Sequence, residues 1–87
     1  LLHRIHHSPG LELCGTMTHI AATEGAREAA GREQVERFDD FLARAQAAGL
    51  STGLVHLANS AALFTDLGGR RGAIRPGIAA LGMLPPG

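Results

Sequence analysis

The stretch TGLVHLANSAALF, residues 52–64, decides how this chain folds. Its first half, residues 52–57, is a short apolar run, which predicts a strand covered on both faces. Asn59 and Ser60 follow at once, and both residue types cap helices well, so the residues up to Phe64 are expected to form a helical turn. A strand that leads directly into a helix indicates an α/β fold.

The helix expected upstream of this stretch covers residues 32–48 and ends at Gly49, because glycine tolerates the left-handed conformation that caps helices. Opposite charges four residues apart mark its polar face, Glu33 with Arg37 and Asp40 with Arg44. Its apolar residues recur at three- and four-residue spacing on one stripe: Val35, Phe38, Leu42 and Ala45.

The remaining segments complete an alternation of strands and helices. Residues 1–7 are typical of the last turns of a helix that Ser8-Pro9-Gly10 stops. Residues 11–19 are expected to form a parallel strand, residues 21–31 a long connection, and residues 72–75 a third strand after a turn at 68–72. The order strand, helix, strand, short helix, strand predicts an α/β fold with parallel strands and right-handed crossovers.

The composition excludes several classes of partner. The formal net charge is zero and the charges of both signs are intermixed, so no basic surface for nucleic acid or an anionic membrane is expected. No apolar run approaches the roughly 20 residues that span a bilayer. The chain has one cysteine, Cys14, which indicates a reducing, cytoplasmic setting and is expected to be a buried small hydrophobe.

Metal binding is not indicated. His3, His6 and His7 include a four-residue helical spacing, but two imidazoles do not complete a tetrahedral zinc site, so a solvated helix end is expected. The neighbouring acidic residues Asp39 and Asp40 are expected on the solvated face of the long helix.

Phosphate binding is one of two readings that the pattern leaves open. Ser60 follows the second expected strand where a helical turn begins, and Gly77 and Ile78 follow the third strand in the same way. Such places offer unpaired backbone N–H groups, and in (β/α)8 barrels the loops after the last two strands often bind phosphate. On the other reading, Ser60 is a helix cap and Gly77 a turn residue, without a ligand.

Two motifs in order favour the first reading: HLANSA at residues 56–61 and RPGI at residues 75–78. They resemble the His-x-Ala-Asn-Ser-Ala and Arg-x-Gly-Ile stretches of alanine racemases, the fold-type III enzymes that use pyridoxal 5′-phosphate. MTHIA at 17–21 and QVERF at 34–38 are similar to further segments of that family. The resemblance implies that residues 1–87 are a fragment of a (β/α)8 TIM barrel domain, about its last three strands with their helices, with no complete domain and no linker.

The resemblance also implies roles for single residues. Ser60 and the backbone amides of Gly77 and Ile78 would hold the cofactor phosphate, and Arg75 would donate a hydrogen bond to the pyridine nitrogen. His56 would orient Arg75 without touching the cofactor itself. An arginine stays protonated at physiological pH, so it can donate a hydrogen bond to the ring nitrogen without giving up a proton.

By the same resemblance His19 would lie against the cofactor, and Asn59 would be a positioning residue among the cofactor-binding residues. Without the family, His19 and His56 would be expected to be histidines satisfied at strand ends.

The chain lacks the residue types that the family uses as its catalytic acid and base. All eight basic residues are arginine, and the chain contains neither lysine nor tyrosine. The family uses a lysine and a tyrosine, the latter from the partner subunit, as acid and base on opposite faces of the α-carbon. Ala80 and Leu81 also precede Gly82 where the family has a hydrophobic residue and tyrosine. This chain alone is therefore expected to be inactive.

The intact protein implied by the resemblance is a homodimer that interconverts L- and D-alanine, the latter for cell-wall peptidoglycan. Three alternatives stay open: a related racemase with another amino acid, a pyridoxal-phosphate carrier, and a non-catalytic α/β module that binds phosphate.

Overall fold

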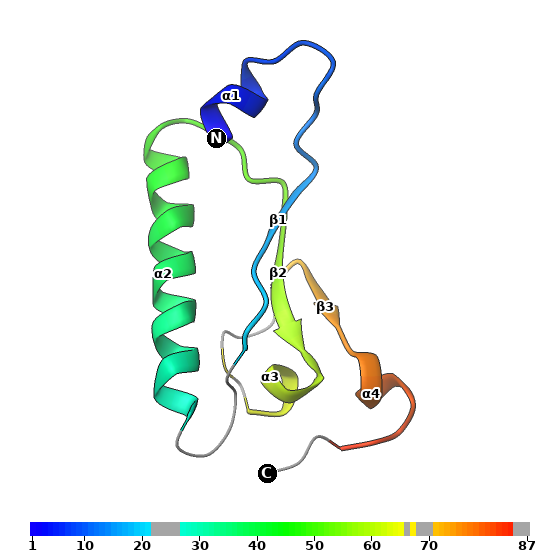
Figure 1. Ribbon diagram of the computed structural model, residues 1–87. Helices are drawn as coiled ribbons and strands as arrows, with labels where there is room; N and C mark the ends of the chain where they lie inside the picture. The colour runs from blue at the N-terminus through cyan, green and yellow to red at the C-terminus, as the bar shows by residue number, and fades with distance from the viewer. Residues whose placement is uncertain (22–26, 66, 68–70, 85–87) are drawn as a thin grey trace.

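The computed structural model describes residues 1–21, 27–65, 67 and 71–84. Its sheet has three strands, β1 (Gly15–Met17), β2 (Leu54–Asn59) and β3 (Ala73–Arg75), which lie in the order β1-β2-β3 (Figure 1). Both pairs of neighbours are parallel. The predicted α/β fold with parallel strands is therefore confirmed for this part of the chain.

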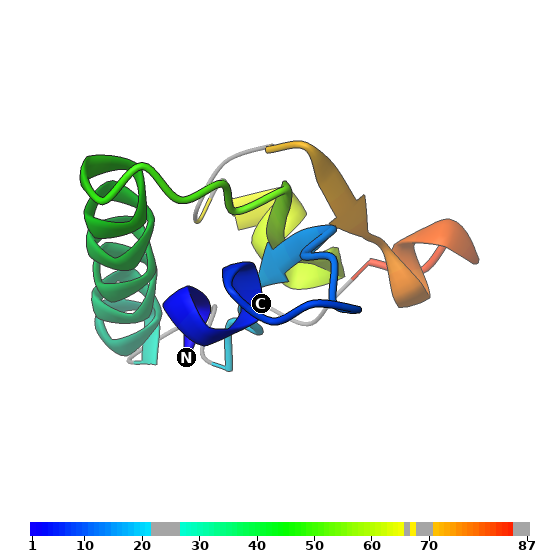
Figure 2. The ribbon, with the colours of Figure 1, turned by 90° about the horizontal axis from the view of Figure 1, so that it is seen from above.

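The described part of the chain also contains four helices: α1 (Leu2–His6), α2 (Glu28–Ala47), α3 (Ser60–Thr65) and α4 (Gly77–Ala80). The long helix α2 runs along one side of the sheet, and α4 lies on the other side, beyond β3 (Figures 1 and 2).

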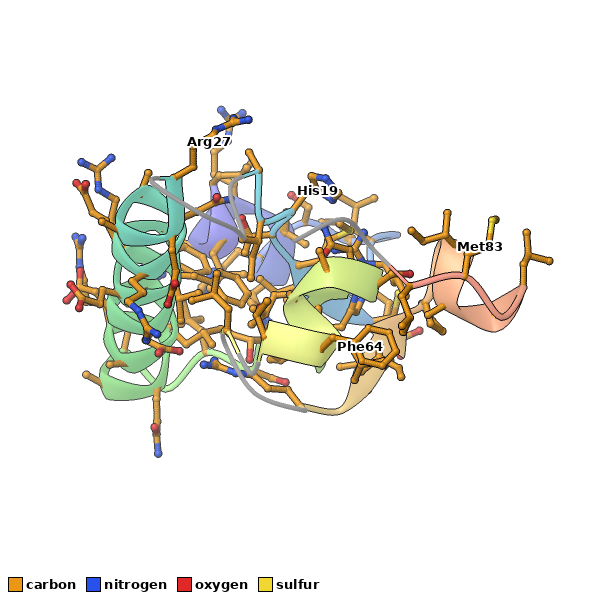
Figure 3. The ribbon with its side chains drawn as sticks, turned by 90° about the horizontal axis from the view of Figure 1, so that it is seen from below. His19, Arg27, Phe64 and Met83 are labelled. Atoms are coloured by element: carbon orange, nitrogen blue, oxygen red, sulfur yellow. The ribbon has the colours of Figure 1, made fainter. Side chains whose placement is uncertain are left out.

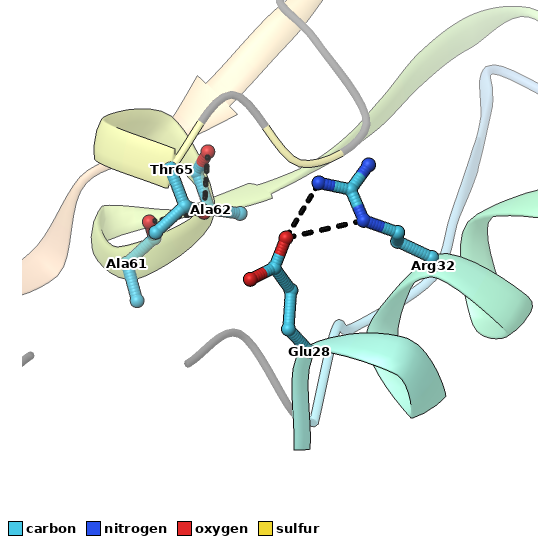
Figure 4. A network of polar contacts seen from close by, with 5 residues as sticks. All are labelled: Glu28, Arg32, Ala61, Ala62 and Thr65. Carbon is cyan, nitrogen blue, oxygen red and sulfur yellow. Dashed lines mark hydrogen bonds and ion pairs between the residues drawn. The ribbon is translucent and has the colours of Figure 1, made fainter. Parts of the chain in front are cut away.

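Helix α2 begins at Glu28, so the expected start at Arg32 is wrong. Ala29 and Ala30 are strong helix formers. Glu28 accepts two hydrogen bonds from the Arg32 guanidinium one turn later, which ties down the first turn (Figure 4). In the same view Thr65 closes α3 by donating its hydroxyl to the Ala61 carbonyl at 3.0 Å.

Strand β1 is much shorter than the expected strand over residues 11–19. Among the described strands, β1 pairs only with β2, and that pairing covers Gly15 to Met17. Cys14 precedes the paired residues, although its carbonyl still accepts the N–H of Leu54 at 3.0 Å. Because β1 is an edge strand here, Cys14 is exposed, and the expectation of a buried cysteine is wrong.

The hydrophobic core lies between α2 and the sheet. The predicted stripe of α2 is confirmed, because Phe38 and Ala45 are buried and Val35 and Leu42 pack against the core. The buried residues of the cluster come from α2, β2, α3 and the segments that follow β1 and α3: Ile20, Phe38, Leu57, Ala58, Ala62 and Leu67. Leu57 and Ile20 are only 1% exposed, so the carboxyl end of the sheet is the best-packed part of this core.

The opposite face of the sheet is more open. Side chains alternate between the two faces of a strand, so Leu54 and His56 point away from the side where Val55 and Leu57 meet the core. His56 lies beside Met17 in the register of the sheet, and Leu54 and Met17 are about half exposed, at 50% and 49%.

A register shift separates the two ends of the β2–β3 pairing. His56 pairs with Ala73, but Asn59 pairs with Arg75. Between these two pairs β2 therefore contains one residue more than β3. Such irregularities re-aim side chains and are common beside functional sites. Here the shift places Arg75 next to Asn59 at the carboxyl end of both strands.

The polar face of α2 carries the predicted ion pairs. Arg37 lies 2.6 Å from Glu33 and Arg44 lies 3.8 Å from Asp40, and all four side chains are largely exposed. Asp39 differs from the expectation of a purely solvated face, because it pairs with Arg71 just before β3. The expected turn at 68–72 falls mostly outside the described residues. Among the helices described, none has the length and apolar character that a bilayer crossing requires.

Candidate functional site

The carboxyl ends of the three parallel strands meet at one edge of the sheet, which Figure 3 views end-on. In open α/β sheets and in barrels this edge is where ligands bind. Segment 18–21 leaves β1 there, α3 starts directly after β2, and α4 starts after β3. The sequence-predicted residues belong to this edge or to the strands that reach it: His19, His56, Asn59, Ser60, Arg75, Gly77 and Ile78.

Ser60 is the first residue of α3 and is 6% exposed, the one buried polar residue among those described. Its Oγ accepts a hydrogen bond from the backbone N–H of Ala79 at 3.1 Å. The start of α3 is thus joined to the first turn of α4, although these elements come from different strands.

The first turn of α4 offers further backbone donors. The N–H groups at the start of a helix have no acceptor within the helix, and Pro76 at the N-cap provides no side-chain acceptor. Gly77 and Ile78 are the first two residues of this turn. A Cβ atom added at Gly77 would meet nothing within 4 Å, so the space in front of this backbone is open.

Asn59 links the end of β2 to two other segments. Its Oδ1 accepts the N–H of Ala62 at 2.9 Å, which makes Asn59 the residue that caps α3. Its Nδ2 donates to the carbonyl of Ile20 at 3.3 Å. One amide side chain therefore fixes both the start of α3 and the chain that follows β1.

Arg75 crosses the edge of the sheet from β3. Its Nη2 donates to the carbonyl of Thr18 at 2.9 Å and to the carbonyl of Leu57 at 3.3 Å. Its Nε is buried and has no hydrogen-bond partner among the described residues. A buried donor without an acceptor costs about 1–3 kcal/mol, and more when the group is charged, so this nitrogen calls for an acceptor that the described residues do not supply.

His56 lies one register position before the shift, beside Met17 of β1 and Ala73 of β3. Its Nδ1 is also buried and lacks a partner among the described residues. Neither this nitrogen nor Nε of Arg75 bonds to the other residue, so a link between His56 and Arg75 stays a prediction.

His19 has an exposed side chain on the segment that leaves β1. Figure 3 shows it on the rim of the carboxyl edge, between the side of α2 and the side that carries Met83. Its backbone carbonyl accepts a hydrogen bond from Nε2 of Gln34.

Gln34 is the residue of this region whose role the sequence did not reveal. Its carboxamide makes three contacts with segment 18–21, with the Thr18 hydroxyl, the His19 carbonyl and the Ala21 N–H. A signal was present, because Gln34 precedes the buried Phe38 by four residues and so faces the sheet rather than solvent.

Among the described residues, those away from this edge show no comparable arrangement. Nε2 of His6 lies 2.8 Å from the carbonyl of Ser51, and Nδ1 of His7 lies 2.7 Å from that of His3. Within the described ranges, no three His, Cys, Asp or Glu residues are grouped to hold a metal ion. A groove between α2 and the chain before β2, lined by Asp39, Gln46 and Gly53 among others, lies at the amino-terminal end of β2, away from these polar groups.

Comparison with known proteins gives a consistent picture. The family model described as "Alanine racemase, N-terminal domain" matches residues 1–85. The chain is 40% identical over 77 residues to alanine racemase 2 of Caldanaerobacter subterraneus subsp. tengcongensis, which covers 87% of this chain and 20% of that protein. It is 38% identical over 75 residues to the alanine racemase of Thermobifida fusca, covering 86% and 20%.

The alanine racemase of Symbiobacterium thermophilum is 36% identical over 85 residues, which is 98% of this chain and 22% of that protein. The chain thus spans about a fifth of the length of the curated relatives it matches. No solved structure gives a significant match.

Proposed function

Because the chain belongs to the family of alanine racemase N-terminal domains, we propose that it is the part of a pyridoxal-phosphate-dependent alanine racemase that holds the cofactor's phosphate and ring nitrogen. The intact protein would interconvert L- and D-alanine. The names of the relatives support this activity, and the geometry of the carboxyl edge supports the role of this segment.

We place residues 1–87 in a (β/α)8 barrel, as about the last three strands with their helices. The parallel strands follow each other in space in their chain order, and the long crossover helix α2 covers one face, as adjacent units of a barrel do. In such barrels the loops after the last two strands bind phosphate, which here would be the starts of α3 and α4.

The phosphate would lie between Ser60 and the first turn of α4. Ser60 already hydrogen-bonds to that turn through Ala79, so its hydroxyl and the N–H groups of Gly77 and Ile78 are close to one another. Backbone N–H groups at a helix start, together with a nearby hydroxyl, are well suited to a phosphate. The open space at Gly77 leaves room for it.

The observation that carries the proposal is the Nε of Arg75, which is buried and has no acceptor within the described ranges. It fits a neutral acceptor such as the pyridine nitrogen of pyridoxal phosphate. When bound, this cofactor withdraws electrons from the α-carbon of the amino acid and so acidifies its C–H bond. Arg75 would donate a hydrogen bond to the ring nitrogen but would keep its own proton. The ring nitrogen would therefore stay neutral, and a neutral ring withdraws electrons less strongly than a protonated one.

The other predicted residues would support these contacts. His56, whose Nδ1 has no hydrogen-bond partner among the residues described, would orient Arg75 once the ligand is bound. Asn59 would keep the start of α3 in place through its cap, and His19 would cover the cofactor from segment 18–21.

The proposal is tested by titrating the intact protein with pyridoxal phosphate and following its absorbance. Ser60→Ala removes one donor to a charged phosphate, so the affinity is expected to fall about tenfold to a hundredfold. The control is Ser8→Ala, since Ser8 donates its hydroxyl to the Arg4 carbonyl after α1, far from the site. A protein that binds no pyridoxal phosphate, or equal affinities for wild type and Ser60→Ala, would overturn the proposal.

A further inference from the structure

Segment 18–21 is held from three sides at the carboxyl edge of the sheet. Arg75 on β3 donates to the Thr18 carbonyl at 2.9 Å, and Asn59 at the end of β2 donates to the Ile20 carbonyl at 3.3 Å. Gln34 on α2 contacts the same segment. Each side chain comes from a different element, so the position of this short segment depends on the helix, the second strand and the third strand together.

Gln34 makes the largest share of these contacts. Its Nε2 donates to the Thr18 hydroxyl at 3.3 Å and to the His19 carbonyl, and its Oε1 accepts the Ala21 N–H at 3.1 Å. A carboxamide can donate and accept at once, and both functions are used on one stretch of backbone. Other long polar side chains of α2, such as Arg32 and Arg37, instead pair along the helix surface.

The Thr18 residue connects this contact to the site. Its hydroxyl meets Gln34, while its carbonyl accepts Nη2 of Arg75. A shift of segment 18–21 would therefore move the carbonyl that holds the guanidinium, and with it the buried Nε. It would also move His19, which the same segment carries.

We propose that Gln34 is a positioning residue, which acts through segment 18–21 to set the direction of the Arg75 guanidinium and the place of His19. It would touch neither cofactor nor substrate. Its effect on ligand binding rests on the proposed function, whereas its effect on Arg75 does not.

The test uses the intact protein with Gln34→Met, Gln34→Glu and the control Gln46→Met. Methionine keeps the length of the side chain and loses all three contacts. Glutamate keeps an acceptor for the Ala21 N–H and loses the donor to the His19 carbonyl. Gln46 is an exposed glutamine on the same helix, so its replacement reports only the general effect of the substitution.

Two readouts require no cofactor. Amide hydrogen exchange at Ala21 is expected to be about tenfold faster in Gln34→Met, as the loss of one hydrogen bond implies, and close to wild type in Gln34→Glu. The Nε–H resonance of Arg75 in a nitrogen–proton NMR spectrum is expected to shift in both variants. The Gln46→Met control should leave both signals unchanged.

The third readout is the affinity for pyridoxal phosphate. We expect it to fall about tenfold in Gln34→Met, with an altered cofactor absorbance, and to fall no further when Gln34→Met is added to Arg75→Ala, because coupled residues are not additive. An unmoved Arg75 Nε–H resonance, or fully additive losses, would overturn the inference. Absence of cofactor binding in the wild type would instead reject the proposed function, and the Arg75 resonance would still decide the role of Gln34.

Discussion

Arg75 combines two tasks in one guanidinium. Its Nη2 donates hydrogen bonds to the backbone of two other segments, at Thr18 and Leu57, while its Nε is buried and finds no acceptor in the part of the chain that the structure describes. The two hydrogen bonds of Nη2 determine where Nε points. A side chain that is already held in place loses little conformational entropy when a ligand binds, so it makes a good ligand contact. The HLANSA and RPGI motifs pointed to this residue, but the carbonyls that hold it lie far away in the sequence and were not predicted.

Replacing Arg75 with glutamate should change the chemistry of the proposed site rather than remove the site. A carboxylate would favour a protonated ring nitrogen, so we expect Arg75→Glu in the intact protein to slow the proposed alanine racemisation on the order of a hundredfold, the size of effect seen when a placed donor is lost. The cofactor absorbance should change as well. Both are measured on the purified protein, by turnover and by spectrum.

The control for this variant is Arg44→Glu, because Arg44 is 80% exposed on α2 and its charge reversal leaves the carboxyl edge untouched. Turnover and a spectrum that match this control would contradict the role assigned to Arg75.

Among the elements, helix α2 was predicted well and strand β1 poorly, for a physical reason. The apolar residues of α2 recur every three or four residues, and only a helix places residues with that spacing on one face. Phe38 and Ala45 are indeed buried. The apolar residues 11–19 have no such period, and the bounds of β1 depend on where β2 pairs with it. Pairing partners, like the contacts of Gln34, are long-range and leave little trace in a local pattern.

Gly53 is a point where this pairing can be tested. Its φ is +63°, and a Cβ atom there would lie 2.5 Å from the carbonyl of Cys14, which accepts the N–H of Leu54. Gly53→Ala should therefore add a steric clash to the strain of a positive φ and should lower the free energy of unfolding of the intact protein by about 2–4 kcal/mol. Urea denaturation measures the loss.

Gly49→Ala is the matched control. Gly49 has a φ of +72° but open space around it, so only the backbone strain of about 1–2 kcal/mol applies. Equal losses for the two variants would show that a Cβ at position 53 adds no steric cost against Cys14, which would contradict the close approach of these two segments.

For the molecule as a whole, the described strands leave both edges of the sheet unpaired, β1 on one side and β3 on the other. Met17 and Leu54 are also half exposed on the face away from α2. Unpaired edges and apolar sheet faces favour further strands, which agrees with a place inside a larger barrel and with relatives of which this chain spans a fifth. The order of elements was readable from the sequence, whereas the number of strands in the proposed barrel came only from the family resemblance.

The most direct test of the account is a crystal structure of the intact protein with pyridoxal phosphate. We expect the phosphate to contact the Ser60 hydroxyl and the N–H groups of Gly77 and Ile78, and the ring nitrogen to accept a hydrogen bond from Nε of Arg75. A cofactor bound elsewhere, for example in the groove beside Gly53, or an Arg75 Nε that stays without an acceptor in the complex, would contradict it.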